Sequence, residues 1–492
     1  MRSRERKDSL ARTKGNFSLQ YLSTRDPQPQ PHMRSFEEVL LAGLAEDGGL
    51  YVPAALPVLD STVLRNHAGL PYAALAAQVM HLFAGTVFSQ DELHRFADRA
   101  YAGFRHAAVT PLVQLDQNLW LLELFHGPTL AFKDMALQLV GQLFDAALAR
   151  CHQHVTIIGA TSGDTGSAAL EACRDLDAVD IFIFYPHRRI SEVQRRQMTT
   201  VASTNAHAIA IEGTFDNCQD LVKALFGDAQ LCQALNLAAV NSINWARIAA
   251  QTVYYFAAAA ALGAPHRRVS FSVPTGNFGN VYAGHIARSM GLPIEHLVIG
   301  TNRNDILARY IATGEMAIAP VEPSLSPSMD IQVSSNFERL LFELKHRDGA
   351  AVADAIARFR RTGILARADA EWGAARRLFS AHRVDDTLTM RVIAETYARS
   401  AMLIDPHTAV AVGAARAELE ADHSGAPMVA LACAHPGKFP DAVERATGVR
   451  PVLPAALADL FERRERVRVL ANDLGAVTDY IRAHARRGGR TA

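Results

Sequence analysis

The sequence predicts an α/β protein with mostly parallel, doubly wound sheets, preceded by a separate N-terminal unit. Beyond residue 105, short runs of Val, Ile, Leu and Phe alternate with longer helical patterns, and such alternation is typical of parallel sheets covered by helices. The chain has 492 residues, 49% of them hydrophobic. Because a single core stops growing at roughly 250–300 residues, we expect two or three domains. The strand candidates are LWLLELF (119–125), VTIIGA (155–160), VDIFIFYP (179–186), AIAIEG (208–213), VSFSVP (269–274), HLVIG (296–300) and MVALACA (428–434).

The two ends of the chain differ from its body. Residues 1–18 are basic and lack the apolar core of a secretory signal, so we expect a disordered tail. Residues 19–105 combine a helical pattern with an Asp-Gly turn in AEDGGLYVP and are predicted to form the N-terminal unit. Residues 106–453 hold the alternating pattern and are predicted to form the core. Residues 454–492, with ADLFERRERV and TDYIRAHARR, are predicted to form a helical segment that packs on the core.

The composition favours a small-molecule partner. Fifty basic residues balance fifty acidic ones, so no strong field would draw the chain to nucleic acid or to an anionic membrane. The most apolar stretch, residues 252–262, is far shorter than the roughly 20 residues of a spanning helix. The cysteines form no C-x-x-C pair, which predicts neither disulfides nor a zinc site and favours the reducing cytoplasm. The five are Cys151, Cys173, Cys218, Cys232 and Cys433.

Histidines give no sign of a metal site. His126, His407 and His435 lack the spacing of metal ligands, and each is predicted to be a hydrogen-bonded structural residue. We therefore expect no bound metal.

Loops that leave the strands at their carboxyl ends are where a doubly wound sheet binds ligands. The first such loop lies in LFHGPTLAFKD, where Lys133 begins a helical pattern. Its neighbours Ala131 and Phe132 are apolar, and burial of the amine would favour the neutral form that makes Schiff bases. Taken alone, the same lysine could equally begin a helix and reach solvent.

The second loop is VPTGNFGN, residues 273–280, between a strand and a helix. Gly276 and Gly279 would let the backbone approach an anion, and the amides at the following helix start would point at it. The missing lysine argues against an NTP-binding loop, and the spacing differs from the dinucleotide fingerprint. An ordinary tight turn explains a lone two-glycine loop equally well.

Two further segments offer anion-binding groups. GATSGDTGSAAL, residues 159–170, places Thr161, Ser162 and Thr165 at a helix start, where they would bind a carboxylate or phosphate or merely cap the helix. NSINWARIAAQ, residues 241–251, places Asn241, Ser242 and Arg247 close together, which would suit a phosphate. The same residues are equally compatible with the start of a surface helix. Each segment is weak evidence alone.

Together and in order, these segments resemble threonine synthase, in its long bacterial and fungal form. That family belongs to the tryptophan-synthase-β-like, fold-type II enzymes that use pyridoxal 5′-phosphate. The resemblance spans nearly the whole chain, because many separated motifs match in sequence order. They are YLSTRD, SFEEVLLAGLAEDGGLYVP, HGPTLAFKD, ATSGDTGSAA, QMTT, EGTFDNCQD, NSINWARIAAQ, VPTGNFGN, TNRNDIL, SPSMDI, SNFERLL, DPHTAV and AHPGKFP. The resemblance implies a core of two α/β subdomains behind an α+β N-terminal domain.

The resemblance also implies roles for single residues. Lys133 matches the Schiff-base lysine and Asp164 the position near the cofactor's phenolic oxygen. The expected cofactor-phosphate loop consists of Gly276, Asn277, Phe278, Gly279 and Asn280. The residues expected to bind substrate are Thr161, Ser162, Thr165, Asn241, Ser242 and Arg247. One departure is Cys433 in ACAHP, where the family pattern suggests a threonine facing the pyridine nitrogen, and a thiol is the weaker hydrogen-bonding group.

The implied activity is the pyridoxal-phosphate-dependent conversion of O-phosphohomoserine and water to threonine and phosphate, the last step of threonine biosynthesis, in a cytoplasmic monomer or homodimer. One rival is a related phospholyase that releases 2-oxobutyrate, ammonia and phosphate. Another is a non-catalytic binding protein on the same fold, which we would expect to have lost the lysine or the phosphate loop.

Overall fold

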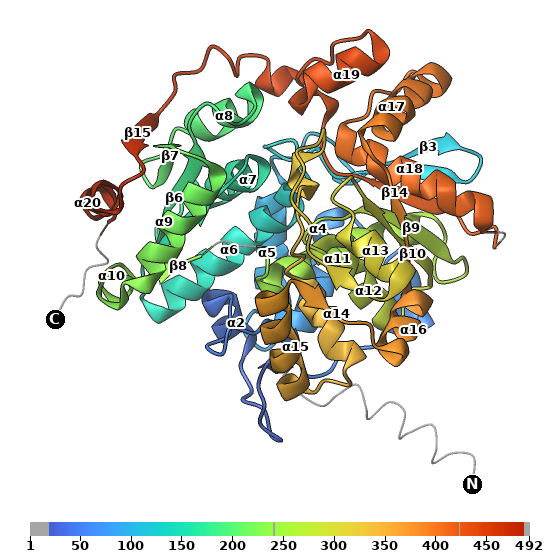
Figure 1. Ribbon diagram of the computed structural model, residues 1–492, viewed down its shortest axis with the longest axis horizontal. Helices are drawn as coiled ribbons and strands as arrows, with labels where there is room; N and C mark the ends of the chain where they lie inside the picture. Colours follow the sequence, from blue (N-terminus) through green and yellow to red (C-terminus); the bar gives the residue numbers. More distant parts are fainter. Residues whose placement is uncertain (1–18, 240–241, 423, 487–492) are drawn as a thin grey trace.

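Two α/β lobes lie side by side in the computed structural model, which describes residues 19–239, 242–422 and 424–486 (Figure 1). One lobe contains a six-stranded sheet in the order β13-β10-β9-β14-β4-β3, parallel except for the β3–β4 pair. The other contains a five-stranded, fully parallel sheet in the order β15-β7-β6-β5-β8. These sheets confirm the predicted class: mostly parallel, doubly wound sheets in two subdomains.

The strands of the first sheet are β3 (Leu112–Asp116), β4 (Leu119–Glu123), β9 (Val269–Pro274), β10 (Ile294–Thr301), β13 (Phe379–Arg383) and β14 (Met428–Ala432). Those of the second are β5 (Val155–Ala160), β6 (Val179–Pro186), β7 (Ala206–Glu212), β8 (Leu237–Ala238) and β15 (Val467–Ala471). Every residue of β6, β9 and β14 is buried. Central parallel strands have helices on both faces, so their sequences are apolar throughout rather than alternating.

Helices cover both sheets. On the five-stranded lobe are α6 (Lys133–Cys151), α7 (Asp164–Cys173), α8 (Glu192–Thr199), α9 (Phe215–Gly227) and α10 (Ala229–Leu235). On the six-stranded lobe are α11 (Trp245–Ala261), α12 (Gly279–Ser289), α13 (Ile306–Thr313), α17 (Asp386–Ser400), α18 (Pro406–Ala421) and α19 (Pro440–Thr447). A lower group holds α14 (Phe337–Leu344), α15 (Gly349–Thr362) and α16 (Asp369–Leu378), with the small pair β11 (Met316–Ala317) and β12 (Ile364–Leu365). Short 3₁₀ turns are η1 (Pro327–Met329), η2 (Pro436–Lys438) and η3 (Ala455–Leu457). Because α6 packs on both α7 and α11, it joins the two lobes.

The N-terminal unit combines an antiparallel pair, β1 (Tyr21–Ser23) and β2 (Tyr51–Pro53), with four helices. These are α2 (Phe36–Ala42), α3 (Ser61–Asn66), α4 (Tyr72–Ala84) and α5 (Gln90–Tyr101). Helix α4 packs on α11 and α5 on α6. The Arg25 guanidinium lies 2.6 Å from the Glu338 carboxylate, and buried Arg339 donates to the Tyr51 carbonyl. In addition to these polar contacts, the buried apolar side chains of the unit belong to the same continuous hydrophobic core as those of the two lobes.

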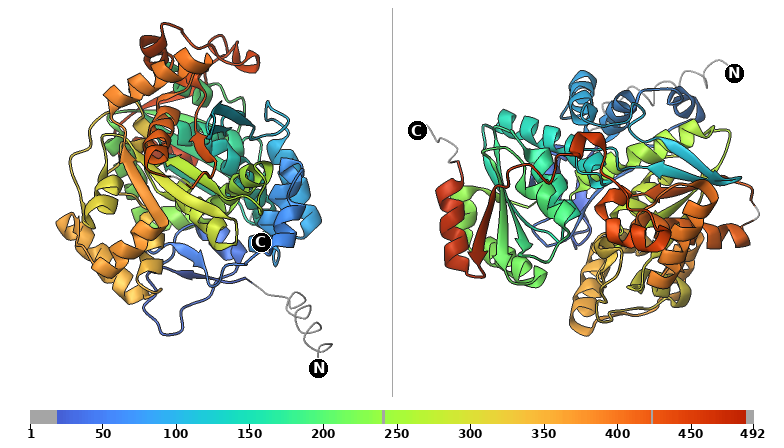
Figure 2. Two further views of the ribbon diagram at one scale, coloured as in Figure 1. Left: turned by 90° about the vertical axis from the view of Figure 1, so that its right-hand side faces the viewer. Right: turned by 90° about the horizontal axis from the view of Figure 1, so that it is seen from above.

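The C-terminal segment differs from the helical layer that we expected for residues 454–492. It crosses from the six-stranded to the five-stranded lobe (Figure 2) and adds β15 in parallel to the edge strand β7 before α20 (Leu474–His484) begins. Its VRVLA strand was missed because an edge strand that is mostly exposed lacks an apolar run. Residues 1–18, predicted to be a disordered tail, lie outside the described residues. Among those that are described, no helix combines the length and the apolar character needed to cross a bilayer.

Candidate active site

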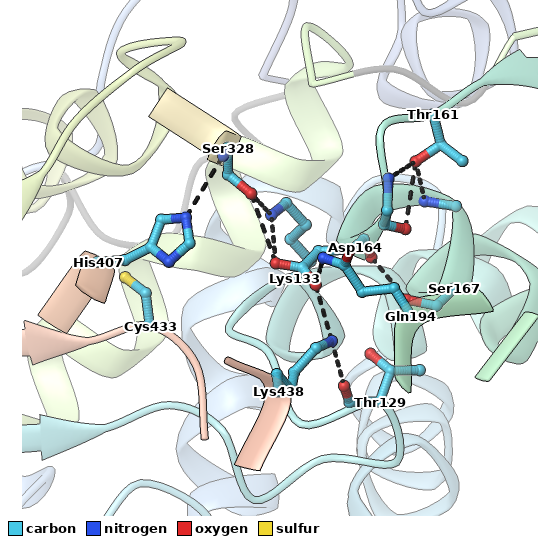
Figure 3. Close-up of polar contacts among 12 residues, drawn as sticks. Thr129, Lys133, Thr161, Asp164, Ser167, Gln194, Ser328, His407, Cys433 and Lys438 are labelled. Atoms are coloured by element: carbon cyan, nitrogen blue, oxygen red, sulfur yellow. Dashed lines mark hydrogen bonds and ion pairs between the residues drawn. The ribbon is translucent and has the colours of Figure 1, made fainter. Parts of the chain in front are cut away.

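Lys133 is the first residue of α6 and lies where the two lobes meet. The loop before it is held by Asp134, whose carboxylate accepts hydrogen bonds from the Thr129 backbone amide and hydroxyl at 2.8 and 2.7 Å. The Lys133 side chain is 10% exposed; its Nζ lies 3.5 Å from Asp164 Oδ2 and 3.4 Å from Ser328 Oγ (Figure 3). Burial lowers the pKa of Lys133, although the nearby Asp164 charge opposes the shift. A lowered pKa favours the neutral amine, and the role of Lys133 as the Schiff-base lysine stays a prediction.

Asp164 is the first residue of α7 and is surrounded by donors. Its Oδ1 accepts from Lys438 Nζ at 2.8 Å and from Gln194 Nε2 at 2.9 Å, and Ser328 Oγ lies 3.4 Å from Oδ2. Burial alone would raise the pKa of Asp164, but the Lys438 and Lys133 cations outweigh burial and hold the pKa well below its usual range. Asp164 is therefore a carboxylate at any physiological pH.

The loop between β9 and α12 has the shape expected of a phosphate cradle. Phe278 adopts the left-handed conformation, with φ +66°, just before the helix. A Cβ at Gly276 would lie 3.1 Å from the Ser328 carbonyl, and one at Gly279 would lie 3.2 Å from Asn336 Nδ2. Only glycine fits these positions without displacing a neighbour. The loop then leads into an eleven-residue helix whose first amides have no intrahelical acceptor, which is the arrangement that binds phosphate.

The other residues of this loop have local partners. The Asn277 carbonyl accepts from the Asn336 backbone amide at 3.1 Å. Asn280 accepts from the hydroxyls of Tyr254 and Tyr255 at 2.6 and 2.9 Å, so its side chain braces the loop. Its Nδ2 lies 4.0 Å from Cys433 Sγ at the end of β14.

Cys433 is buried, and burial raises the pKa of its thiol, so it remains uncharged. We expect Cys433→Ser to retain the fold and to change kcat by less than about tenfold, because it alters one weak hydrogen-bonding contact and no charge. Steady-state kinetics with Cys232→Ser, outside the site, as control would test this expectation. A loss beyond about 10²-fold in Cys433→Ser alone would contradict it.

The loop after β5 contains the predicted residues Thr161, Ser162 and Thr165. Thr161 Oγ1 accepts from the amides of Gly163 and Gly166 at 3.0 and 2.9 Å, so its hydroxyl organises the loop itself. Ser162 is exposed and Thr165 is half-buried at the start of α7. Substrate binding by these hydroxyls stays a prediction, and Thr161 has a structural role in any case.

The three predicted phosphate-binding residues of the NSINWARIAAQ segment differ in where the structure places them. Asn241 lies outside the described residues. Ser242 is half-buried, and its carbonyl accepts from Asn336 Nδ2 at 3.2 Å. Arg247 is 4% exposed, and within the described parts of the chain its Nε and Nη1 have no hydrogen-bond partner. With Asn244 it lines a largely apolar cavity of about 30 Å³. Burial lowers the pKa of Arg247 to about 10, which still leaves it cationic at neutral pH.

Four residues of the site had no predicted catalytic or binding role: Gln194, Ser328, His407 and Lys438. His407 accepts from the Ser328 amide at 3.4 Å, and its other ring nitrogen lies 2.7 Å from Asp405. The predicted structural role of His407 agrees with these bonds. The motifs SPSMDI, DPHTAV and AHPGKFP contain three of the four residues and were the only signal. Among the described residues, no group of His, Cys, Asp or Glu side chains is placed to hold a metal ion.

The fold and the lysine site define a class of enzyme, and the comparisons agree. The family "Pyridoxal-phosphate dependent enzyme" matches residues 104–370, more than half of the chain. Flanking it, "Threonine synthase N terminus" matches residues 20–101 and "Threonine synthase, C-terminal" matches residues 408–481. The chain is therefore a pyridoxal-phosphate-dependent enzyme.

Similar proteins narrow this class further. Threonine synthase from Pseudomonas aeruginosa is 55% identical over 96% of this chain and 99% of its own. The crystal structure of pyridoxal-phosphate-bound threonine synthase from Brucella melitensis is 50% identical, with a TM-score of 0.92 over 95% of this chain and 100% of its own. The yeast threonine synthase structure is 39% identical, with a TM-score of 0.91 over 96% and 99%. This chain belongs to the threonine synthase family.

Proposed function

We propose that this threonine synthase converts O-phosphohomoserine and water into threonine and phosphate. The observation that carries the proposal is the site itself, within a chain of the threonine synthase family: a buried lysine with a lowered pKa, a glycine loop suited to a phosphate, and a buried arginine whose Nε and Nη1 have no hydrogen-bond partner among the described residues. The substrate is a small molecule that contains an amine, a carboxylate and a phosphate. Arg247 would match the phosphate, and Thr161, Ser162 and Thr165 stay the predicted ligands of the carboxylate or phosphate.

The residues present fit pyridoxal phosphate. Lys133 would hold its aldehyde carbon, the amides of residues 276–280 its phosphate, and Cys433 would face its ring nitrogen. When bound, this cofactor accepts the electron pair left at the substrate carbon from which a proton is removed. Lys133 Nζ, once free, would be the base that takes that proton, and burial lowers its pKa, which favours the neutral form that a base requires.

Arg247 supplies the other function that the reaction needs. A buried guanidinium without a partner binds phosphate more strongly than an exposed one, because little water competes and two of its N–H groups can donate in parallel. We propose that it binds the substrate phosphate and stabilises that group as it leaves. Water then has to add to the carbon chain in the same enclosed site.

Product analysis tests this function. Purified protein with pyridoxal phosphate and O-phosphohomoserine is expected to form threonine and inorganic phosphate in equal amounts. Phosphate with an equal amount of 2-oxobutyrate and ammonia would instead identify a phospholyase. Cofactor binding without turnover would leave the fold as a binding protein and would overturn the proposal.

We infer further that the enzyme is cytoplasmic and works as a monomer or homodimer. All five cysteines lie in the described residues and are free thiols, which agrees with a reducing compartment. Sedimentation at micromolar concentration would measure the oligomeric state.

A further inference from the structure

Lysine is rare in this chain. Among its 50 basic residues only six are lysines, at positions 7, 14, 133, 223, 345 and 438, and the rest are arginines. Two of the six, Lys133 and Lys438, are buried against the same carboxylate. Arginine supplies nearly all other positive charge, yet these two positions hold the compact, deprotonatable cation. Such use of lysine indicates that the protonation of this pair matters.

Lys438 is fully buried, with 0% of its side chain exposed, at the end of the turn η2 that follows β14. Its Nζ contacts Asp164 Oδ1 at 2.8 Å and donates to the Thr129 carbonyl at 2.7 Å (Figure 3). Lys133 approaches the opposite oxygen, Oδ2, at the longer distance of 3.5 Å. Asp164 thus has a close partner in Lys438 and a looser one in Lys133.

This asymmetry has an electrostatic consequence. If Asp164 had no other partner, it would pair with Lys133 and favour the ammonium form, which cannot attack a carbonyl carbon. Because Lys438 already neutralises Asp164, the attraction on Lys133 is largely cancelled. A second cation beside the same carboxylate also disfavours charge on Lys133 directly.

The other groups that face Lys133 act in both directions. Arg247, on α11, opposes charge on the amine. The neutral Cys433 thiol would favour that charge only if it ionised, and the Phe132 ring, 5.0 Å from Nζ, favours the ammonium form. On the α18 side, His407 lies against Asp405 and Ser328. Of the two lysines at Asp164, Lys438 is the closer, at 2.8 Å against 3.5 Å for Lys133.

We propose that Lys438 is a positioning residue that keeps Lys133 in its neutral, nucleophilic form by neutralising Asp164. The proposal rests on the proposed function in one respect, the role of Lys133 as the Schiff-base lysine. Lys438 itself touches neither the substrate nor the reacting carbon in this account.

The test is a pH titration of the full-length chain freed of its cofactor, with ¹³C at lysine Cε. Six lysines give a spectrum simple enough to assign, and Lys133→Ala identifies the Lys133 signal. We expect Lys438→Met to raise the midpoint of Lys133 by about one pH unit or more, and Lys438→Arg to leave it close to that of the parent chain. An unmoved midpoint in Lys438→Met, or an equal rise in Lys438→Arg, would overturn the proposal.

A double variant covers the case in which Lys438→Met fails to fold because Asp164 is left unpaired. Asp164→Asn combined with Lys438→Met removes the carboxylate and its partner together, so a pair that is already neutral predicts a Lys133 midpoint within about half a pH unit of the parent's. A fall of about one pH unit or more would show that Asp164 still attracts Lys133 in the parent chain and would overturn the proposal. Lys223→Met, at an exposed lysine, is the matched control and should shift nothing. The titration uses no substrate, so its failure is distinct from a wrong product in the assay of the parent chain.

Discussion

Lys133→Ala is expected to lower the rate of threonine formation by at least about 10³-fold. The change removes both the amine that would hold the cofactor and the base that would take the proton, and a methyl group replaces neither function. The rate of phosphate release, measured with saturating cofactor, checks the expectation.

The control for this change is Lys223→Ala, which removes an exposed lysine with 72% of its side chain accessible and should leave kcat unchanged. Circular dichroism should be the same for both variants, because truncation at the first position of α6 leaves the helix intact. A Lys133→Ala protein that kept more than about a tenth of the parent rate would show that another group does the chemistry.

Arg247→Met is expected to lower kcat/KM for O-phosphohomoserine by at least about 10²-fold, because a charge-assisted bond to the substrate phosphate is lost in the transition state. The same change should stabilise the protein. It removes a buried cation whose Nε and Nη1 have no hydrogen-bond partner in the described part of the chain, and methionine fills a similar volume. We expect the free energy of unfolding to rise by about 1–3 kcal/mol.

Steady-state kinetics and urea unfolding on one preparation test the expected fall in kcat/KM and the expected rise in the free energy of unfolding. Arg268→Met is a matched control, since that guanidinium is 71% exposed, and it should change neither quantity appreciably. A stable Arg247→Met protein with unaltered kcat/KM would remove Arg247 from the substrate site. A strongly destabilised one would show that Arg247 is a structural residue.

The sequence predicted the central strands well and the edge strands poorly. All seven candidate runs are strands, because a strand that is buried on both faces must be apolar throughout. The unpredicted β3 and β15 lie at sheet edges and are largely exposed or half-buried, so their composition resembles that of a loop. β15 is a strand because it pairs with β7, which is distant in sequence, and no local pattern encodes that pairing. β3 instead pairs with the next strand, β4, across the short turn at residues 117–118.

The site shows the same division. Lys133 became a candidate through its apolar neighbours and its position at a helix start, both of which are local, and the family resemblance then favoured it over a solvent-exposed lysine. Ser328, which contacts Lys133, and Lys438, which contacts Asp164, were not predicted. Both come from turns that are far away in the sequence and reach the site only after folding. The bonds that Thr161 accepts from the Gly163 and Gly166 amides could not be predicted from the motif either, and its binding to substrate stays a prediction.

The most direct test of the account is to find which lysine holds the cofactor. Treatment of the cofactor-loaded protein with sodium borohydride adds hydride to the imine carbon and fixes the cofactor as a stable secondary amine, which peptide mass spectrometry can locate. We predict that the pyridoxyl group lies on Lys133 and that Lys438 is unmodified. A label on Lys438, or on no lysine of a protein that still forms threonine, would contradict this prediction.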